Sequence, residues 1–214
     1  MKTRMSSRLA ILARRAELGR GKTRLAATVG PERALEIYRH LIGLTATAAR
    51  ASGLPTTVYF DPAPGDLDVW PDPPFSHARQ PTSADLGIRI ATALLRELEA
   101  GGGTDPSGAI VIGTDAPELT GSVLAEAATA LEQYDAVLGP SIDGGFYLLG
   151  VRSLPVDLFD GVAWSTDGVA DAVREAFRQN RWRWRELPVL RDVDTEEDWA
   201  AYRATLPSPA PKPT

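Results

Sequence analysis

The stretch Leu9-Ala10-Ile11-Leu12-Ala13, followed by a polar loop with Gly19-Arg20-Gly21-Lys22-Thr23-Arg24, decides the fold of this chain. An uninterrupted apolar run of this length predicts a buried strand. Glycines directly after a strand let backbone N–H groups approach phosphate oxygens, and Lys22 and Arg24 would neutralise the phosphate charge. The stretch therefore predicts a first strand that leads into a nucleotide-binding loop. A solvated basic turn is the alternative.

The rest of the chain alternates between helical and strand patterns. Helices are expected at residues 31–52, 85–100, 120–133 and 167–180, with a last one from Thr195. Strands are expected at residues 56–60, 109–113, 135–139, 146–151 and 182–187, and an irregular, proline-containing loop at residues 61–74. This order predicts an α/β fold with a mostly parallel central sheet and helices on both faces. Such folds bind ligands beyond the carboxyl ends of their strands.

Composition excludes several classes of protein. The 214 residues fit one domain, expected over residues 1–205, with a loose proline-rich tail at 206–214. The absence of cysteine excludes a disulfide framework and a thiolate metal site. A net charge of −5 without a basic stripe argues against nucleic acid as a partner. Because no apolar run is long enough for a membrane span or a signal peptide, a cytoplasmic protein is expected.

The second candidate cluster is Gly113-Thr114-Asp115-Ala116-Pro117, at the end of a buried strand. A carboxylate at this place can bind Mg²⁺ or Mn²⁺ that bridges to phosphate oxygens. Helix capping is the alternative role for Asp115, but Thr120 is the more natural cap of the following helix. The position therefore favours metal binding by Asp115.

The third cluster, Asp143-Gly144-Gly145, lies between two expected strands. The glycines would let an acceptor or a sugar approach closely, while Asp143 binds a hydroxyl or acts as a base. The alternative is a hairpin-like turn in which Asp143 serves only the backbone. Ser165 and Thr166 are further candidates for contact with the acceptor or sugar, with capping of the next helix as the favoured alternative.

The fourth cluster contains Asp192 and Asp194, which are two residues apart. In an extended segment their carboxylates project to the same side, as a second metal ligand requires. Thr195 with Asp198 resembles a capping box, so Asp194 could instead be a neighbour of a helix cap. The choice between Asp192 and Asp194 as the metal ligand stays open.

Gly21-Lys22-Thr23 also matches the end of a P-loop. The first glycine of that motif is missing, because its position is Ala16. A P-loop is also followed by a long helix, whereas Gly30-Pro31 interrupts the chain soon after Thr23. A true P-loop is therefore disfavoured.

Together these motifs resemble the DUF2064 family, also described as arsenosugar-biosynthesis or radical-SAM/selenodomain-associated glycosyltransferases of the glycosyltransferase-A fold. The segments that carry the resemblance are Gly21-Lys22-Thr23-Arg24-Leu25, Asp85-Leu86-Gly87, Gly113-Thr114-Asp115-Ala116-Pro117, Asp143-Gly144-Gly145-Phe146-Tyr147, Trp164-Ser165-Thr166 and Arg191-Asp192-Val193-Asp194-Thr195. The chain departs from the family pattern at residues 15–19, where Pro-x-Pro-Gly is usual, and at Ala84, where glycine is usual.

The resemblance implies a Rossmann-like nucleotide-sugar fold. It implies that Lys22 and Arg24 lie near the diphosphate and that Asp115 is the metal-binding carboxylate. The residues that it assigns to the nucleotide site are Gly21, Lys22, Arg24, Asp85, Gly87, Thr114 and Asp115. The chain is also similar to molybdenum-cofactor and 2-phospholactate nucleotidyltransferases, so the reaction stays open.

The leading hypothesis is glycosyl transfer from a nucleoside-diphosphate sugar to a small-molecule acceptor. Lys22, Arg24 and the metal would stabilise the leaving diphosphate, and Asp143 would position or deprotonate the acceptor. The alternative is nucleotidyl transfer from a nucleoside triphosphate to a phosphorylated small molecule, with release of pyrophosphate. A non-catalytic nucleotide-binding module is a second alternative. The oligomeric state is open, a homodimer included.

Overall fold

The computed structural model describes residues 7–61, 68–101 and 108–206. The elements in chain order are β1 (Arg8–Arg14), α1 (Thr23–Val29), α2 (Pro31–Ser52), β2 (Thr56–Asp61), β3 (Phe75–Arg79), α3 (Leu86–Ala100), β4 (Ala109–Ile112), α4 (Gly121–Ala130), β5 (Ala136–Pro140), β6 (Phe146–Val151), α5 (Val169–Gln179), β7 (Trp184–Glu186) and α6 (Glu196–Thr205). All five predicted helices are present, as are the six predicted strands.

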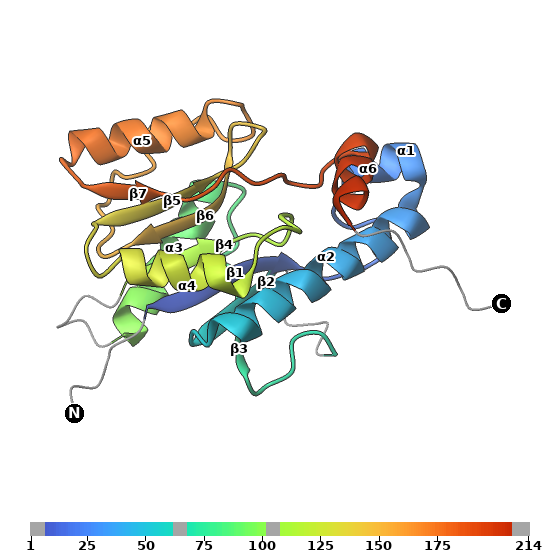
Figure 1. The fold of residues 1–214 in the computed structure, drawn as a ribbon, viewed down its shortest axis with the longest axis horizontal. Helices are drawn as coiled ribbons and strands as arrows, with labels where there is room; N and C mark the ends of the chain where they lie inside the picture. The colour runs from blue at the N-terminus through green and yellow to red at the C-terminus, as the bar shows by residue number, and fades with distance from the viewer. Residues whose placement is uncertain (1–6, 62–67, 102–107, 207–214) are drawn as a thin grey trace.

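Within the described residues the strands form one seven-stranded sheet in the order β3-β2-β1-β4-β6-β5-β7 (Figure 1). β1 pairs in parallel with β2 and β4, β2 with β3, and β5 with β7. β6 alone runs antiparallel to its neighbours, because the tight turn between β5 and β6 leaves no room for a crossover helix. The predicted α/β fold with a mostly parallel sheet is confirmed.

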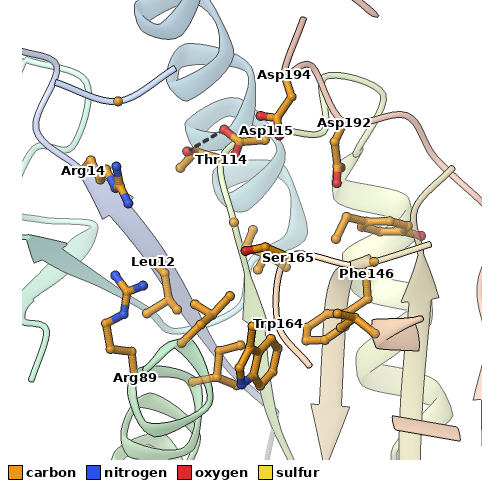
Figure 2. Close-up of a pocket in the computed structure, with 18 of the residues that line it drawn as sticks. Leu12, Arg14, Arg89, Thr114, Asp115, Phe146, Trp164, Ser165, Asp192 and Asp194 are labelled. Atoms are coloured by element: carbon orange, nitrogen blue, oxygen red, sulfur yellow. Dashed lines mark hydrogen bonds between the residues drawn. The ribbon is translucent and has the colours of Figure 1, made fainter. Parts of the chain in front are cut away.

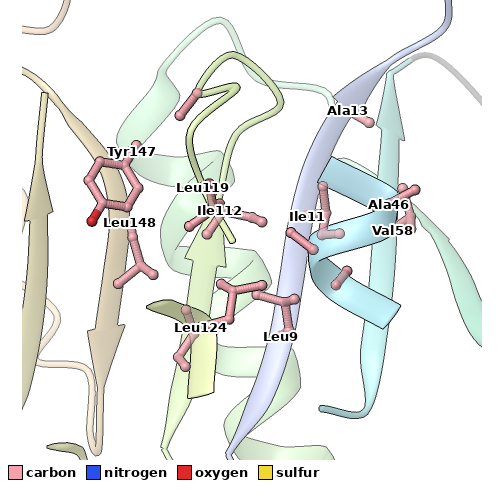
Figure 3. Close-up of a cluster of buried hydrophobic side chains, with 14 of the residues drawn as sticks. Leu9, Ile11, Ala13, Ala46, Val58, Ile112, Leu119, Leu124, Tyr147 and Leu148 are labelled. Carbon is pink, nitrogen blue, oxygen red and sulfur yellow. The ribbon is translucent and has the colours of Figure 1, made fainter. Parts of the chain in front are cut away.

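Helices cover both faces of the sheet, as predicted. One apolar cluster joins α2 and α4 to β1, β2 and β4, and Figure 3 shows Leu9, Ile11 and Ile112 of the sheet in this cluster beside Ala46 and Leu124. The second cluster joins α3 and α5 to the opposite face. A third cluster packs α1 against α2 and α6. In Figure 1, α1 and α6 lie together at one end of the molecule, and the long α2 runs from there across it.

Two short elements were not predicted. The helix α1 has seven residues and no side-chain cap, and Gly30 ends it, so it shows no complete amphipathic period. Its Leu25 is buried against α2 and α6, which supplies the stability that the local sequence lacks. The strand β3 follows two prolines, Pro73 and Pro74, and such surroundings predict a loop.

Parts of three predictions fall outside the described residues. These are residues 62–67 of the irregular loop, Gly102 and Gly103 after α3, and residues 207–214 of the tail. The single domain over residues 1–205 stays a prediction. Among the described helices, none combines the length and the apolar character that crossing a membrane requires.

Alanine substitutions at two glycines, Gly43 in α2 and Gly121 at the start of α4, are expected to change stability in opposite directions. A Cβ at Gly121 would lie 2.6 Å from Ala51 Cβ and 2.9 Å from the Ala51 carbonyl carbon, whereas a Cβ at Gly43 meets nothing within 4 Å. We expect Gly121→Ala to lower the free energy of unfolding by about 1–3 kcal/mol, because α2 and α4 must move apart. Gly43→Ala should raise it by roughly 0.5–1 kcal/mol through helix propensity. Urea denaturation measures both, and equal effects would contradict the packing.

Candidate functional site

A pocket of about 1030 Å³ opens at the carboxyl ends of β1 and β4. Its walls come from the glycine loop before α1, the start of α3, the β5–β6 turn, residues 164–167, and the carboxylates that precede α6 (Figure 2). The predicted position beyond the strand ends is the one that doubly wound folds use for ligands.

Lys22 is the central cation of this pocket. Its Nζ lies 2.8 Å from Asp115 Oδ1 and 3.0 Å from Asp194 Oδ1, and it donates to the Val193 carbonyl at 2.5 Å. The side chain is only 5% exposed. Burial by itself would lower the pKa of Lys22, but the charges of the two carboxylates outweigh burial and raise the pKa above its ordinary value. Lys22 is therefore a charged bridge between two of the predicted metal ligands.

Asp194 forms an ion pair with a second cationic side chain. Arg24 Nη2 lies 2.6 Å from Asp194 Oδ2, on the exposed side of the pair. The backbone N–H of Asp194 donates to Asp198, whose carboxylate and the Thr195 hydroxyl form the predicted capping box at the start of α6. Asp194 thus lies in the pocket and beside a helix cap, and its role as a metal ligand stays a prediction.

Asp115 projects from the end of β4 with its side chain 43% exposed. It does not cap α4, because the hydroxyl of Thr120 fills that role by accepting from Val123 N. Thr114, itself buried, donates to Asp115 Oδ1 at 3.4 Å, and the Asp115 carbonyl accepts from Val193 N at 2.9 Å. The end of β4 is therefore joined to the segment before α6.

Asp192 is the most perturbed carboxyl group of the pocket. Its burial raises its pKa to about 7, and the negative charges of Asp115 and Asp143 act in the same direction. The Ser141 hydroxyl and the charge of Lys22 oppose the increase. Asp192 is therefore a buried carboxyl group whose ionisation is opposed first by burial and then by the neighbouring carboxylates.

Asp143 has the predicted turn role and also faces the pocket, while its role toward an acceptor stays a prediction. Its Oδ1 accepts from Gly145 N at 2.9 Å, which closes the turn between β5 and β6, and its side chain also lines the pocket. Gly145 lines the pocket too. At Gly144, with φ of 85°, a Cβ would lie 1.9 Å from the Asp167 carbonyl oxygen, so this glycine allows the chain before α5 to pass.

Ser165 and Thr166 line the pocket, but the expectation that their hydroxyls cap α5 is wrong. The N-cap of α5 is Gly168, without a side-chain hydrogen bond. Thr166 Oγ1 donates to the Ala163 carbonyl at 2.8 Å and accepts from Gly168 N at 3.4 Å, so it contacts the N-cap residue without capping the first turn of α5. Ser165 has a left-handed φ of 65°, an uncommon conformation for a residue other than glycine, asparagine or aspartate.

The Asp85-Leu86-Gly87 segment shapes the opposite wall. Asp85 lines the pocket and caps α3, since its Oδ1 accepts from Ile88 N at 3.0 Å. A Cβ at Gly87 would lie 2.9 Å from the Trp164 ring, so this glycine makes room for the tryptophan. Gly87, which the sequence assigned to the nucleotide site, is not among the residues that line the pocket and lies behind its wall.

Sequence reasoning missed several pocket residues. Arg14 is the last residue of β1, and the rule that chemistry follows strand ends would have found it. Gln80 follows β3, which was not predicted, and Arg89 lies one turn after Asp85.

Trp164 and Phe146, whose rings meet edge to face at 6.4 Å, form an apolar part of the wall.

Tyr38 fixes the end of β1 beside the pocket. Its hydroxyl donates to the Arg14 carbonyl at 2.9 Å and accepts from Arg14 N at 3.1 Å. Burial raises the pKa of Tyr38, so it stays a neutral donor near neutral pH. The long helix α2 thus holds the strand end from which Arg14 projects.

The donor chemistry of the pocket suits a hard cation, because Asp115, Asp192, Asp194 and Asp143 offer only oxygen. Among the described residues, however, no three His, Cys, Asp or Glu side chains are close enough together to hold an ion. Lys22 occupies the space between Asp115 and Asp194. The carboxylates fit Mg²⁺ or Mn²⁺ by type, although they are not gathered around a single point.

Comparison with known proteins agrees with this arrangement. Residues 44–166 match the model of the DUF2064 family, described as an uncharacterized protein conserved in bacteria. A protein from Desulfovibrio desulfuricans G20, described provisionally as a nucleotide-diphospho-sugar transferase, is 31% identical and has a TM-score of 0.82. The alignment covers 94% of this chain and 88% of that one. No curated protein sequence matches the chain.

More distant structures share the fold alone. The complex of Rv0371c from Mycobacterium tuberculosis H37Rv with manganese is 16% identical, with a TM-score of 0.50, over 94% of this chain and 100% of that one. The 4-diphosphocytidyl-2C-methyl-D-erythritol synthase of Anaerococcus prevotii DSM 20548 is 12% identical, with a TM-score of 0.52, over 92% and 97%.

The sheet order and the pocket at its strand ends define a Rossmann-like α/β protein of the glycosyltransferase-A type. Within this class the chain belongs to the DUF2064 family.

The raised pKa of Asp192 predicts a pH-dependent effect of Asp192→Asn on stability. Between an ordinary pKa near 3.8 and about 7 the native protein binds the extra proton, so the free energy of unfolding falls as pH rises through this window. Because asparagine does not ionise, the Asp192→Asn variant does not lose stability in this pH window. We expect the variant to match the wild type near pH 4 and to be roughly 2–4 kcal/mol more stable above pH 7. Denaturation with chelator present measures this, and a gain that is independent of pH would contradict it.

Proposed function

We propose that this protein is a metal-dependent glycosyltransferase that moves a sugar from a nucleoside-diphosphate sugar to a small-molecule acceptor. Its relative at 31% identity, described provisionally as a nucleotide-diphospho-sugar transferase, supports a nucleotide-dependent transferase. The observation that carries the proposal is the bridge of Lys22 between Asp115 and Asp194, beside the glycine loop at the strand ends. The groups that we propose for phosphate binding and for metal binding therefore lie in one pocket.

Asp115 and Asp192 are the proposed ligands for Mg²⁺ or Mn²⁺. Asp194 is already engaged by two cations, whereas Asp192 makes no ion pair with the described basic residues. The charge of Asp115 acts on Asp192, so a cation that both carboxylates share would relieve their repulsion. When bound, such an ion would neutralise negative charge on the diphosphate. The related Rv0371c has been solved with manganese, which is in keeping with this assignment.

The remaining residues receive roles from their positions. Gly21, Lys22 and Arg24 would contact the diphosphate, with Thr114 beside Asp115. Asp143, which keeps one oxygen on Gly145, would accept a hydrogen bond or a proton from the acceptor. The hydroxyls of Ser165 and Thr166 would contact the sugar or the acceptor, while Asp85 lies at the nucleotide end near α3.

Nucleotidyl transfer to a phosphorylated small molecule is the second candidate. The observation that favours it is the presence of Arg14 and Arg89 in the same pocket, on the side away from Asp115, Asp192 and Asp194 (Figure 2). A phosphorylated acceptor would place a second anion in the pocket in addition to the nucleotide phosphates. The two reactions differ in the product that leaves.

Asp115→Asn should reduce metal-dependent nucleotide binding by at least about tenfold, because an amide is a poor replacement for an anionic ligand. Titration calorimetry with nucleoside-diphosphate sugars and nucleoside triphosphates, each with Mn²⁺ or with chelator, measures the change. Asp157→Asn, at an exposed position outside the pocket lining, is the matched control. Unchanged affinity in the Asp115 variant would rule out its metal role.

The same sugar nucleotides and nucleoside triphosphates, used as substrates, distinguish the two candidate reactions. Release of a nucleoside diphosphate from a sugar nucleotide, in the presence of acceptor, supports glycosyl transfer. Release of pyrophosphate from a triphosphate supports nucleotidyl transfer instead. If nucleotides bind with metal but neither product forms with any acceptor, the proposal of catalysis is wrong.

A further inference from the structure

The end of β5 carries a buried hydroxyl group that the proposed function leaves unused. Ser141 directly follows β5 and is only 5% exposed. Its Oγ is buried and makes no hydrogen bond with any residue that the structure describes. Because burial of a polar group without a partner is costly, an alanine at this position would serve the fold at least as well. The hydroxyl group therefore points to a role other than stability.

The hydroxyl group of Ser141 lies beside the carboxyl group of Asp192. Burial raises the pKa of Asp192, and the contact with Ser141 is the largest effect that opposes this rise. The hydroxyl group thus favours the ionised form of Asp192, which is the form that binds a cation. The contact falls outside hydrogen-bond geometry, so a donor is in place beside Asp192 without being used by it.

Backbone hydrogen bonds hold the two residues in this relation. Ser141 pairs in parallel with Leu190, which extends the pairing of β5 and β7 toward the pocket. Leu190 N donates to the Pro140 carbonyl at 3.2 Å, and the Leu190 carbonyl accepts from Ile142 N at 3.0 Å. Asp192 follows two residues later and therefore starts from a backbone position that the sheet fixes.

The segment that carries Asp192 is also fixed on its other side. Val193 N donates to the Asp115 carbonyl at 2.9 Å, so the chain crosses from the end of β5 to the end of β4, and Asp192 lies on that crossing. Thr114 offers Asp115 a similar group, since its Oγ1 donates to Asp115 Oδ1 at 3.4 Å. Each of the two proposed cation ligands thus has a hydroxyl group from a strand end at its side.

We propose that Ser141 is a positioning residue for the Mg²⁺ or Mn²⁺ ion. Its hydroxyl group donates to one oxygen of Asp192 and leaves the other oxygen for the ion that Asp192 shares with Asp115. A hydrogen bond to one oxygen restricts the rotation of the carboxylate, and such outer bonds orient metal-binding carboxylates in proteins. A neutral donor also leaves the negative charge of Asp192 to the ion, whereas Asp194 is paired with two cationic side chains.

This inference rests on the proposed function, because it assumes that Asp115 and Asp192 bind the ion. It separates stability from metal affinity. Ser141→Ala removes a hydroxyl group without a hydrogen-bond partner, so the melting temperature in chelator should stay within about 2 °C of the wild type or rise. The apparent affinity for Mn²⁺ should fall about tenfold, because Asp192 loses the donor that orients it.

The test uses the full chain, with Mn²⁺ alone as the probe. Electron paramagnetic resonance of the free ion measures its apparent affinity, and Asp115→Asn defines the background from other acidic side chains. Ser141→Thr keeps the hydroxyl group and should stay within about threefold of the wild type. The matched control is Ser7→Ala, which should leave the affinity unchanged. Ser7 is also buried, at 6% exposure, but precedes β1 at the end of the sheet opposite the pocket.

The serine variants decide the positioning role. Loss of Mn²⁺ affinity in Ser141→Ala, with the melting temperature kept and the affinity restored in Ser141→Thr, supports it. Wild-type affinity in Ser141→Ala overturns it and leaves the proposed ion site standing. A lower melting temperature of Ser141→Ala in chelator also overturns it, because the hydroxyl group then serves the fold. If Ser141→Thr keeps the wild-type melting temperature but binds Mn²⁺ as weakly as Ser141→Ala, the hydroxyl group is not the cause and the inference is wrong.

Failure of the proposed function gives a different result. If the wild type binds Mn²⁺ no better than Asp115→Asn does, the metal role of Asp115 is wrong, and the positioning role of Ser141 is overturned with it.

Discussion

The pocket depends on one buried interaction, the contact of the Lys22 ammonium with Asp115, Asp194 and the Val193 carbonyl. It joins the glycine loop, the end of β4 and the segment before α6, which are far apart in the sequence. A buried ammonium is costly unless carboxylates surround it, and removal of one partner leaves an uncompensated charge. The bond from Val193 N to the Asp115 carbonyl holds two of the same segments together. The geometry of the acidic end is therefore set by charge pairing as well as by apolar packing.

Such pairing leaves the pocket with an uneven charge distribution. Six carboxylates line it, and Lys22 and Arg24 neutralise only part of their charge; the six are Asp85, Asp115, Asp143, Asp167, Asp192 and Asp194. The negative charges of Asp115 and Asp143 add to the effect of burial in raising the pKa of Asp192. A protein under selection for stability alone would not keep unpaired carboxylates together, so the excess is typical of a functional site. On the wall formed by the end of β1 and the start of α3, Arg14 and Arg89 give an excess of positive charge.

The sequence predicted the long elements and the strand-end chemistry, because both depend on local patterns. The helix α2 shows its full apolar period between Pro31 and Gly53, and Asp115 follows a short apolar run that favours a buried strand. Short elements such as α1 and β3 are stabilised by residues distant in sequence, so local patterns miss them. The partners of Lys22, the lack of a partner at Arg89 and the failure of Ser165 and Thr166 to cap α5 depend on the folded chain.

The family segments divide into residues that present chemistry and residues that shape the pocket. Gly87 in one segment makes room for Trp164 in another, and Gly144 in a third makes room for the backbone of Asp167. A larger residue at Gly87 would displace the Trp164 ring and with it the adjacent Ser165, which lines the pocket. These glycines thus act on the ligand through the positions of other side chains. A substitution at Gly87 and one at Trp164 should therefore be strongly non-additive, because both change the same contact.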